Sequence, residues 1–211
     1  MILEGKIGPR YGADGAEGPF RLDKSFAQVV AQAGGKYGEA VARGIVFSAS
    51  TNATSGVAPG TAIGTTAAFT LANPAGSKVN LMVLRTTMAF VSGTLGAGSI
   101  QYIASANPVG TAVSGTALVA QPCLIGSRAG ASGLAFTTAT IPAGPLQLRP
   151  FATTMAMIAA GAHPPFTVTD DVDGEFIITP GCALSLEGQG GAGGTPLLCF
   201  GMTWLEYGNG S

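Results

Sequence analysis

The chain has 211 residues and a formal net charge of −1, and 46% of its residues are hydrophobic while only 10% are charged. A typical soluble domain has about 25% charged residues. Without a basic excess or a polybasic cluster, binding to nucleic acid or to a membrane surface is not expected.

The charges are unevenly distributed along the chain. Residues 1–43 hold 11 of the 21 charged residues, so residues 44–211 hold only 10. A free domain of that size normally exposes many more charges. Either neighbouring subunits cover this neutral surface, or Thr, Ser, Asn and Gln side chains solvate it. We favour a homo-oligomer, because low net charge also promotes association.

The first 43 residues are predicted to form an N-terminal arm that contains one short helix. Five glycines between residues 5 and 18 favour an extended chain, whose first 20 residues could reach on the order of 60 Å. Asp23 can cap a helix that ends at Gly34 and Gly35.

One face of this predicted helix is apolar. Phe26, Val29, Val30 and Ala33 follow the helical spacing i, i+3, i+4 and i+7. The stripe could pack on its own domain or dock on a neighbour, and the sequence leaves both open.

The arm is predicted to bind a partner, because it cannot bury enough surface to order itself alone. The expected anchors are apolar side chains, together with two arginines that would pair with acidic groups. These anchors are Arg10, Tyr11, Phe20, Arg21, Phe26, Val29 and Val30.

Residues 44–211 are predicted to form one all-β, antiparallel sandwich or barrel domain, because short apolar runs alternate with turn-forming residues. The predicted strands are residues 45–50, 67–72, 78–92, 99–105, 116–125, 146–151, 175–179, 183–187 and 196–207. The expected core comprises Phe47, Leu81, Val83, Phe176, Ile178, Leu186, Phe200 and Trp204. In the last strand Leu198, Phe200, Met202 and Trp204 alternate on one face.

Few residues could carry chemistry. His163 is the only histidine and has no cysteine nearby, so a zinc site is not expected. Cys123, Cys182 and Cys199 lie in apolar strand-like segments and indicate buried thiols in a reducing cytoplasm.

One acid-rich segment and one glycine-rich segment each resemble a known ligand-binding motif, but each lacks part of that motif. Asp170, Asp171, Asp173 and Glu175 form the only dense acidic group; the final glutamate of a calcium loop is missing, so a solvated turn or a looser cation site remains. Residues 188–193 match the glycine pattern of dinucleotide sites, but a strand is predicted to follow rather than a helix.

We therefore predict a non-enzymatic protein without a cofactor. No nucleophile motif is present, and the single histidine leaves few groups for acid–base catalysis. Carboxylate pairs brought together by folding stay open, because the sequence does not reveal pairing in space.

Three stretches resemble virion structural proteins of tailed phages. They are residues 36–47 (KYGEAVARGIVF), 167–182 (TVTDDVDGEFIITPGC) and 200–206 (FGMTWLE), and the resemblance covers about residues 36–207. It implies a jelly-roll-like sandwich, a place on the virion after synthesis in the host cytoplasm, and a capsid decoration (cement) role, often as a trimer. The expected partners are further copies of the chain and the major capsid protein or other virion proteins.

A second function class is a receptor- or glycan-binding module of a phage tail or head fibre. Such a module needs exposed aromatic side chains near polar loops. The chain has one tryptophan, within a predicted strand, which leaves Tyr102 and Tyr207 as candidates.

Overall fold

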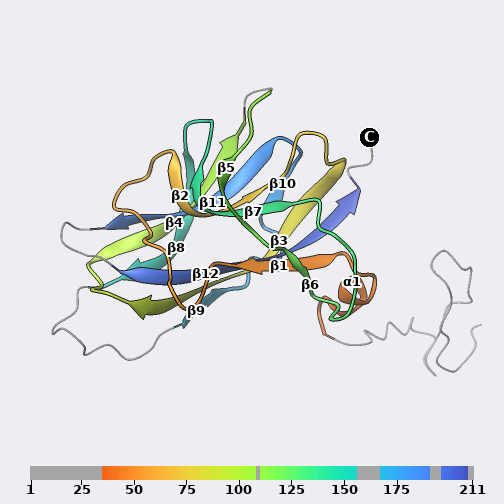
Figure 1. Ribbon diagram of the computed structural model, residues 1–211, viewed down its shortest axis with the longest axis horizontal. Helices are drawn as coiled ribbons and strands as arrows, with labels where there is room; N and C mark the ends of the chain where they lie inside the picture. The colour runs from red at the N-terminus through yellow and green to blue at the C-terminus, as the bar shows by residue number, and fades with distance from the viewer. Residues whose placement is uncertain (1–34, 108–109, 156–166, 191–195, 209–211) are drawn as a thin grey trace, which may run out of the picture. The chain divides into compact units, whose positions relative to one another are not determined.

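The computed structural model describes residues 35–107, 110–155, 167–190 and 196–208. The chain divides into two units, Met1–Glu39 and Ala40–Ser211. The second unit is an all-β sandwich of two antiparallel sheets, as predicted, preceded by a short helix, α1 (Gly38–Ala42). Figure 1 shows the two sheets as two layers.

The first sheet has the strand order β10-β3-β12-β1-β6, with β9 pairing along β3. Its strands are β1 (Val46–Ser50), β3 (Val79–Ser92), β6 (Gln121–Pro122), β9 (Thr167–Asp170), β10 (Ile177–Ile178) and β12 (Leu197–Gly208). The long pair of β3 and β12 forms its centre.

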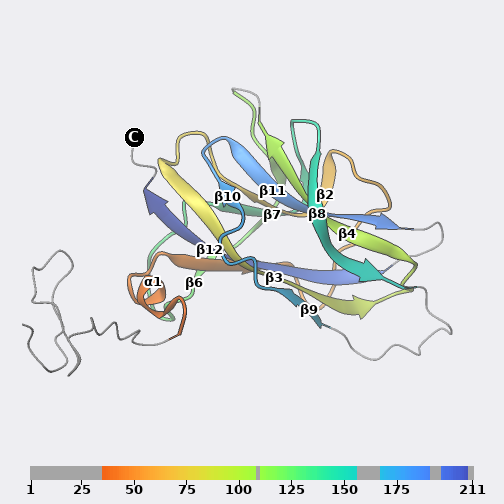
Figure 2. The same cartoon turned by 180° about the vertical axis from the view of Figure 1, so that it is seen from behind.

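The second sheet has the order β5-β7-β2-β11-β4-β8. Its strands are β2 (Thr66–Ala72), β4 (Gly98–Ala106), β5 (Ser114–Leu118), β7 (Leu134–Thr140), β8 (Leu146–Thr154) and β11 (Cys182–Gly190). Figure 2 shows both layers from behind, with β8 and β10 in view.

The strand order is that of a jelly roll. In one sheet β1, β12 and β3 lie side by side, with β9 and β10 both pairing with β3, and in the other the order is β2-β11-β4-β8; the chain changes sheet at each step from β1 to β4 and again from β10 to β12. β5, β6 and β7 are an insertion between β4 and β8 that widens both sheets on one side. The jelly-roll-like, all-β fold is thus present.

The core lies between the two sheets. Leu198, Phe200, Met202 and Trp204 of β12 are all buried there, which confirms the predicted alternation. Of the eight predicted core residues, seven are buried, and Phe176 is partly buried against them. The three cysteines are free thiols and only partly buried.

Some element predictions differ from the structure. β7 and β9 were not predicted, because β7 is rich in Thr and Ala and β9 has only four residues. The predicted strand at 116–125 is two strands, β5 and β6, that belong to different sheets. At 175–179, only Ile177 and Ile178 pair as a strand.

Residues 1–34 of the predicted 43-residue arm, which include the predicted helix from Asp23, lie outside the described residues. The helix α1 begins later, at Gly38, and is a different element from the one expected between Asp23 and Gly34. Among the described residues, no helix has the length and apolar character needed to cross a membrane.

Candidate functional site

A cluster of charged and aromatic side chains surrounds Arg149 at one margin of the sandwich. Arg149 Nη2 lies 2.9 Å from Asp170 Oδ2 and 2.8 Å from Glu175 Oε2. Its guanidinium also lies 4.9 Å from the ring centroid of Tyr102 and 5.2 Å from that of Phe176. Arg149 and Tyr102 belong to the second sheet, while Asp170 and Phe176 lie along β3 of the first, so the cluster ties the two sheets together.

Tyr102 completes this cluster from inside. Its hydroxyl donates to Asp170 Oδ2 at 2.9 Å. Burial raises the pKa of Tyr102 far above its ordinary value, and the Asp170 carboxylate raises it further. The hydroxyl therefore remains a hydrogen-bond donor over the ordinary pH range. Because Tyr102 is fully buried, it cannot be the sugar-stacking side chain considered above.

The acidic group at 170–175 is divided among arginines. Asp170 and Glu175 face Arg149, whereas Asp171 accepts from Arg85 Nε at 2.7 Å. Within the described ranges, no three His, Cys, Asp or Glu side chains come together as a possible metal site. These carboxylates act as partners for cations of the chain itself.

An apolar groove, here called the edge groove, lies beside the Arg149 cluster. It has a volume of about 530 Å³ and opens between β8 and β4 of one sheet and β10 of the other. The residues that line it include Ala104 and Leu184, together with the three partly exposed side chains of Leu146, Leu148 and Ile177. These three larger side chains are 65%, 41% and 49% exposed, so the margin of the core is uncovered here.

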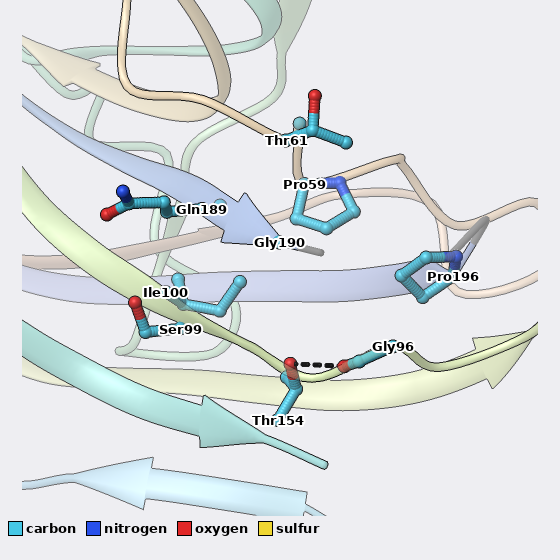
Figure 3. Close-up of a pocket in the computed structure, with 11 residues that line it drawn as sticks. Pro59, Thr61, Gly96, Ser99, Ile100, Thr154, Gln189, Gly190 and Pro196 are labelled. Carbon is cyan, nitrogen blue, oxygen red and sulfur yellow. Dashed lines mark hydrogen bonds between the residues drawn. The ribbon is translucent and has the colours of Figure 1, made fainter. Parts of the chain in front are cut away.

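The glycine-rich segment that begins at Gly188 borders a much smaller hollow. Figure 3 shows it among Pro59, Ile100 and Pro196, with Thr154 Oγ1 donating to the carbonyl of Gly96 at 2.8 Å. Its volume of about 30 Å³ is on the scale of one water molecule. β12 follows at Leu197, so a strand comes after the glycines, as predicted, and the hollow has no room for a nucleotide.

The close approach of residues 59 and 60 to the backbone of β11 explains why position 188 is a glycine. A Cβ there would lie 2.7 Å from Pro59 Cβ and 2.8 Å from the carbonyl oxygen of Gly60. Its N–H donates to the carbonyl of Pro59 at 2.6 Å. The glycine thus serves backbone packing rather than phosphate binding.

Of the glutamates in the described part of the chain, two are buried, and both hold connecting segments. The Glu206 carboxylate accepts from the N–H groups of Ser132 and Gly133 at 2.9–3.0 Å and from Trp204 Nε1 at 3.0 Å. Glu187 Oε2 accepts from Gly64 N at 2.8 Å, while its Oε1 has no hydrogen-bond partner, and burial raises its pKa. Glu187 and Glu206 lie on different sheets, so they do not form a carboxylate pair on one strand face.

A second group of exposed apolar side chains lies on the opposite margin. Val119 and Ile125 are 74% and 96% exposed, and Leu134 is 47% exposed. A hollow of about 310 Å³ is lined there by residues of β5 and β7, including Leu134 and Phe136. Apolar side chains therefore reach the surface at both margins.

The predicted partner-binding residues, Arg10, Tyr11, Phe20, Arg21, Phe26, Val29 and Val30, lie outside the described residues, as does His163. The sequence analysis did not single out Leu146, Leu148 or Arg149. The sequence feature that could have indicated these residues is a single arginine within an apolar predicted strand. Such a strand fits the edge of a sheet, where it pairs on one side only. No protein-family model, curated protein or solved structure matches the chain.

Proposed function

We propose that the chain is a non-enzymatic structural subunit of a tailed-phage virion, a capsid decoration (cement) protein that binds and stabilises the head as a homo-oligomer, most simply a trimer. It would be made in the host cytoplasm and would bind further copies of itself and the major capsid protein or another virion protein. Neutral sandwich faces would form the contacts between copies, and the arm would lie across neighbouring subunits.

The observation that carries the proposal is that seven of the ten charges in residues 44–211 are either buried or paired with one another. Glu187 and Glu206 are buried, and Arg85, Arg149 and their acidic partners neutralise one another. The surface left over has few charges to interact with water, yet it exposes large apolar side chains at both margins. Such a surface favours burial against other subunits.

Covering these margins would supply the energy of assembly. Each Å² of apolar surface removed from water contributes about 25 cal/mol. Permanent assemblies bury more than roughly 2,000 Å² in total, and two apolar margins per subunit suit a closed ring of copies. The jelly roll alone does not choose the function, since it occurs in both viral capsid and lectin domains.

Two measurements test the proposal. Sedimentation of the full chain should give an oligomer at micromolar concentration, and electron microscopy of phage particles should locate the protein on the head surface. A monomer at high concentration that contacts nothing on the particle would contradict it. Density at the tip of a fibre would instead favour the receptor- or glycan-binding module, for which Tyr207 would be the aromatic candidate among the residues considered.

A further inference from the structure

The edge groove is a corner of the core that the described residues leave uncovered. In the pairing of β8 with β4, Leu146 lies directly opposite Ala104. Residues opposite one another in antiparallel strands project to the same face. Leu146 therefore projects to the core side of its sheet, where a leucine is normally buried, and yet it is 65% exposed.

Small side chains and a short edge strand explain the opening. Ala104 and Ala106 line the groove where larger residues would fill it, and β10, on the facing sheet, has only two residues. The volume of about 530 Å³ lies within the range of about 300–1,000 Å³ found for pockets that hold a ligand. The corner can accept several apolar side chains from another segment.

The chain itself contains a segment of matching chemistry. Thirty-four residues precede Gly35, the first described residue, and they include the apolar stripe Phe26, Val29, Val30 and Ala33. This i, i+3, i+4, i+7 spacing is the one by which an amphipathic helix binds an apolar groove. Arg21 and Lys24 flank the stripe, and the rim of the groove carries Glu175, which pairs with Arg149 while its side chain stays 51% exposed.

We propose that the edge groove of each subunit binds the stripe of a neighbouring copy, with Phe26 inserted toward Ala104 and Leu184 and a basic flank near Glu175. This inference rests on the proposed self-assembly and names the contact that links the copies. An exchange of arms between neighbours buries the groove and the stripe together, and it joins subunits through a segment that the sandwich does not need for its own core.

Photo-crosslinking in the full-length chain tests the contact directly. A photoreactive phenylalanine analogue replaces Phe26, and 15N-labelled and unlabelled chains are mixed before irradiation. The crosslinked peptides should map to residues 104–106, 146–148 and 176–184, and should pair labelled with unlabelled chains at the share expected for random mixing. The same analogue at Gln28, on the opposite face of the predicted helix, is the matched control and should yield few groove products.

Two variants give an independent readout. Leu146→Glu combined with Ile177→Glu should weaken self-association of the full chain at least about tenfold, because both carboxylates would be buried without partners. Phe26→Glu combined with Val30→Glu should have the same effect. Mixing the two double variants should restore association into mixed pairs, because the intact stripe of one variant can bind the intact groove of the other.

The outcomes separate this inference from the proposed function. Crosslinks that map elsewhere, products within single chains only, or equal yields from positions 26 and 28 would overturn the exchange of arms, even if the chain sediments as an oligomer. Unchanged association of the Leu146→Glu, Ile177→Glu variant would also overturn it. A full chain that stays monomeric and is absent from particles would remove the proposed function together with this inference.

Discussion

The two margins of the sandwich differ in whether a connecting segment covers the core side chains. At one margin the chain crosses from β6 to β7, and residues 132 and 133 cover Trp204 and Leu81. This cover is held by the buried Glu206 carboxylate. At the other margin, between β8 and β10, the edge groove is left open and Leu146 is exposed.

The difference shows what closes a sandwich. A connecting segment brings unpaired backbone N–H groups to the core, and these need an acceptor there. Glu206 supplies that acceptor for three donors at once. The groove margin instead has Arg149, which links the two sheets with ion pairs and lies over the ring of Phe176, while Leu146 stays exposed. At the first margin a segment of the subunit covers the core side chains Leu81 and Trp204, although Ile125 and Leu134 stay exposed there; at the groove margin Leu146 on the core side is exposed.

The largest expected loss of stability comes from removing the hydrogen bonds by which Glu206 holds residues 132 and 133 over the core. Glu206→Ala leaves the buried Gly133 N and Trp204 Nε1 and the part-buried Ser132 N without an acceptor, and each buried donor costs about 1–3 kcal/mol. We expect the free energy of unfolding to fall by about 3 kcal/mol or more in urea titrations. Glu206→Gln, which keeps one carbonyl oxygen, should lose less. A change below about 0.5 kcal/mol for Glu206→Ala would mean that the carboxylate does not hold the cover.

The next largest effect depends on how tightly Gly133 packs against Leu81 and Trp204. A Cβ on Gly133 would lie 2.8 Å from Leu81 Cδ1 and 3.1 Å from Trp204 Nε1. Gly133→Ala should therefore destabilise the domain by about 1–3 kcal/mol through overpacking. Gly144→Ala, at the rim of the open groove, meets no atom within 4 Å and is the matched control. Equal thermal midpoints for the two variants would break the distinction between a packed margin and an open one.

A smaller effect is expected at the Arg149 cluster. The Arg149 side chain is 31% exposed, so water screens the ion pairs that it forms. Arg149→Leu should lower stability by about 1 kcal/mol, since Asp170 and Glu175 would lose their cation. Arg149→Lys keeps the charge but cannot donate to both carboxylates in the same planar geometry, so it should restore part of the loss. High salt should weaken the native protein more than Arg149→Leu, and an equal response would argue against the ion pairs.

The smallest effect concerns Glu187, which holds residue 64 with only one hydrogen bond. Burial raises its pKa, so the folded state favours the protonated form, and ionised Glu187 costs stability. Glu187→Gln should be more stable than the native chain by up to about 1 kcal/mol at neutral pH. The difference should shrink as pH falls through the raised pKa of the folded state, and vanish below the unfolded value of about 4.3. A gap that stays constant with pH would contradict this.

Much of the fold could be predicted from local patterns. In β12, Leu198, Phe200, Met202 and Trp204 alternate with small or polar residues, and a strand with one buried face is the structure that satisfies this pattern. All nine predicted strand segments overlap observed strands. β7 was missed because a Thr- and Ala-rich segment such as LAFTTAT takes its pairing from neighbours rather than from its own apolar content, and β9 was missed because it has only four residues.

Local sequence thus determined the strands, their apolar faces and the scarcity of surface charge. Tertiary structure alone decided the order of the strands in the two sheets, because jelly-roll pairing joins segments such as β1 and β12 from opposite ends of the domain. It also decided which apolar residues stay uncovered. Leu146 and Leu198 have the same side chain, yet the first is exposed and the second buried, because only the segment packed opposite a residue removes it from water.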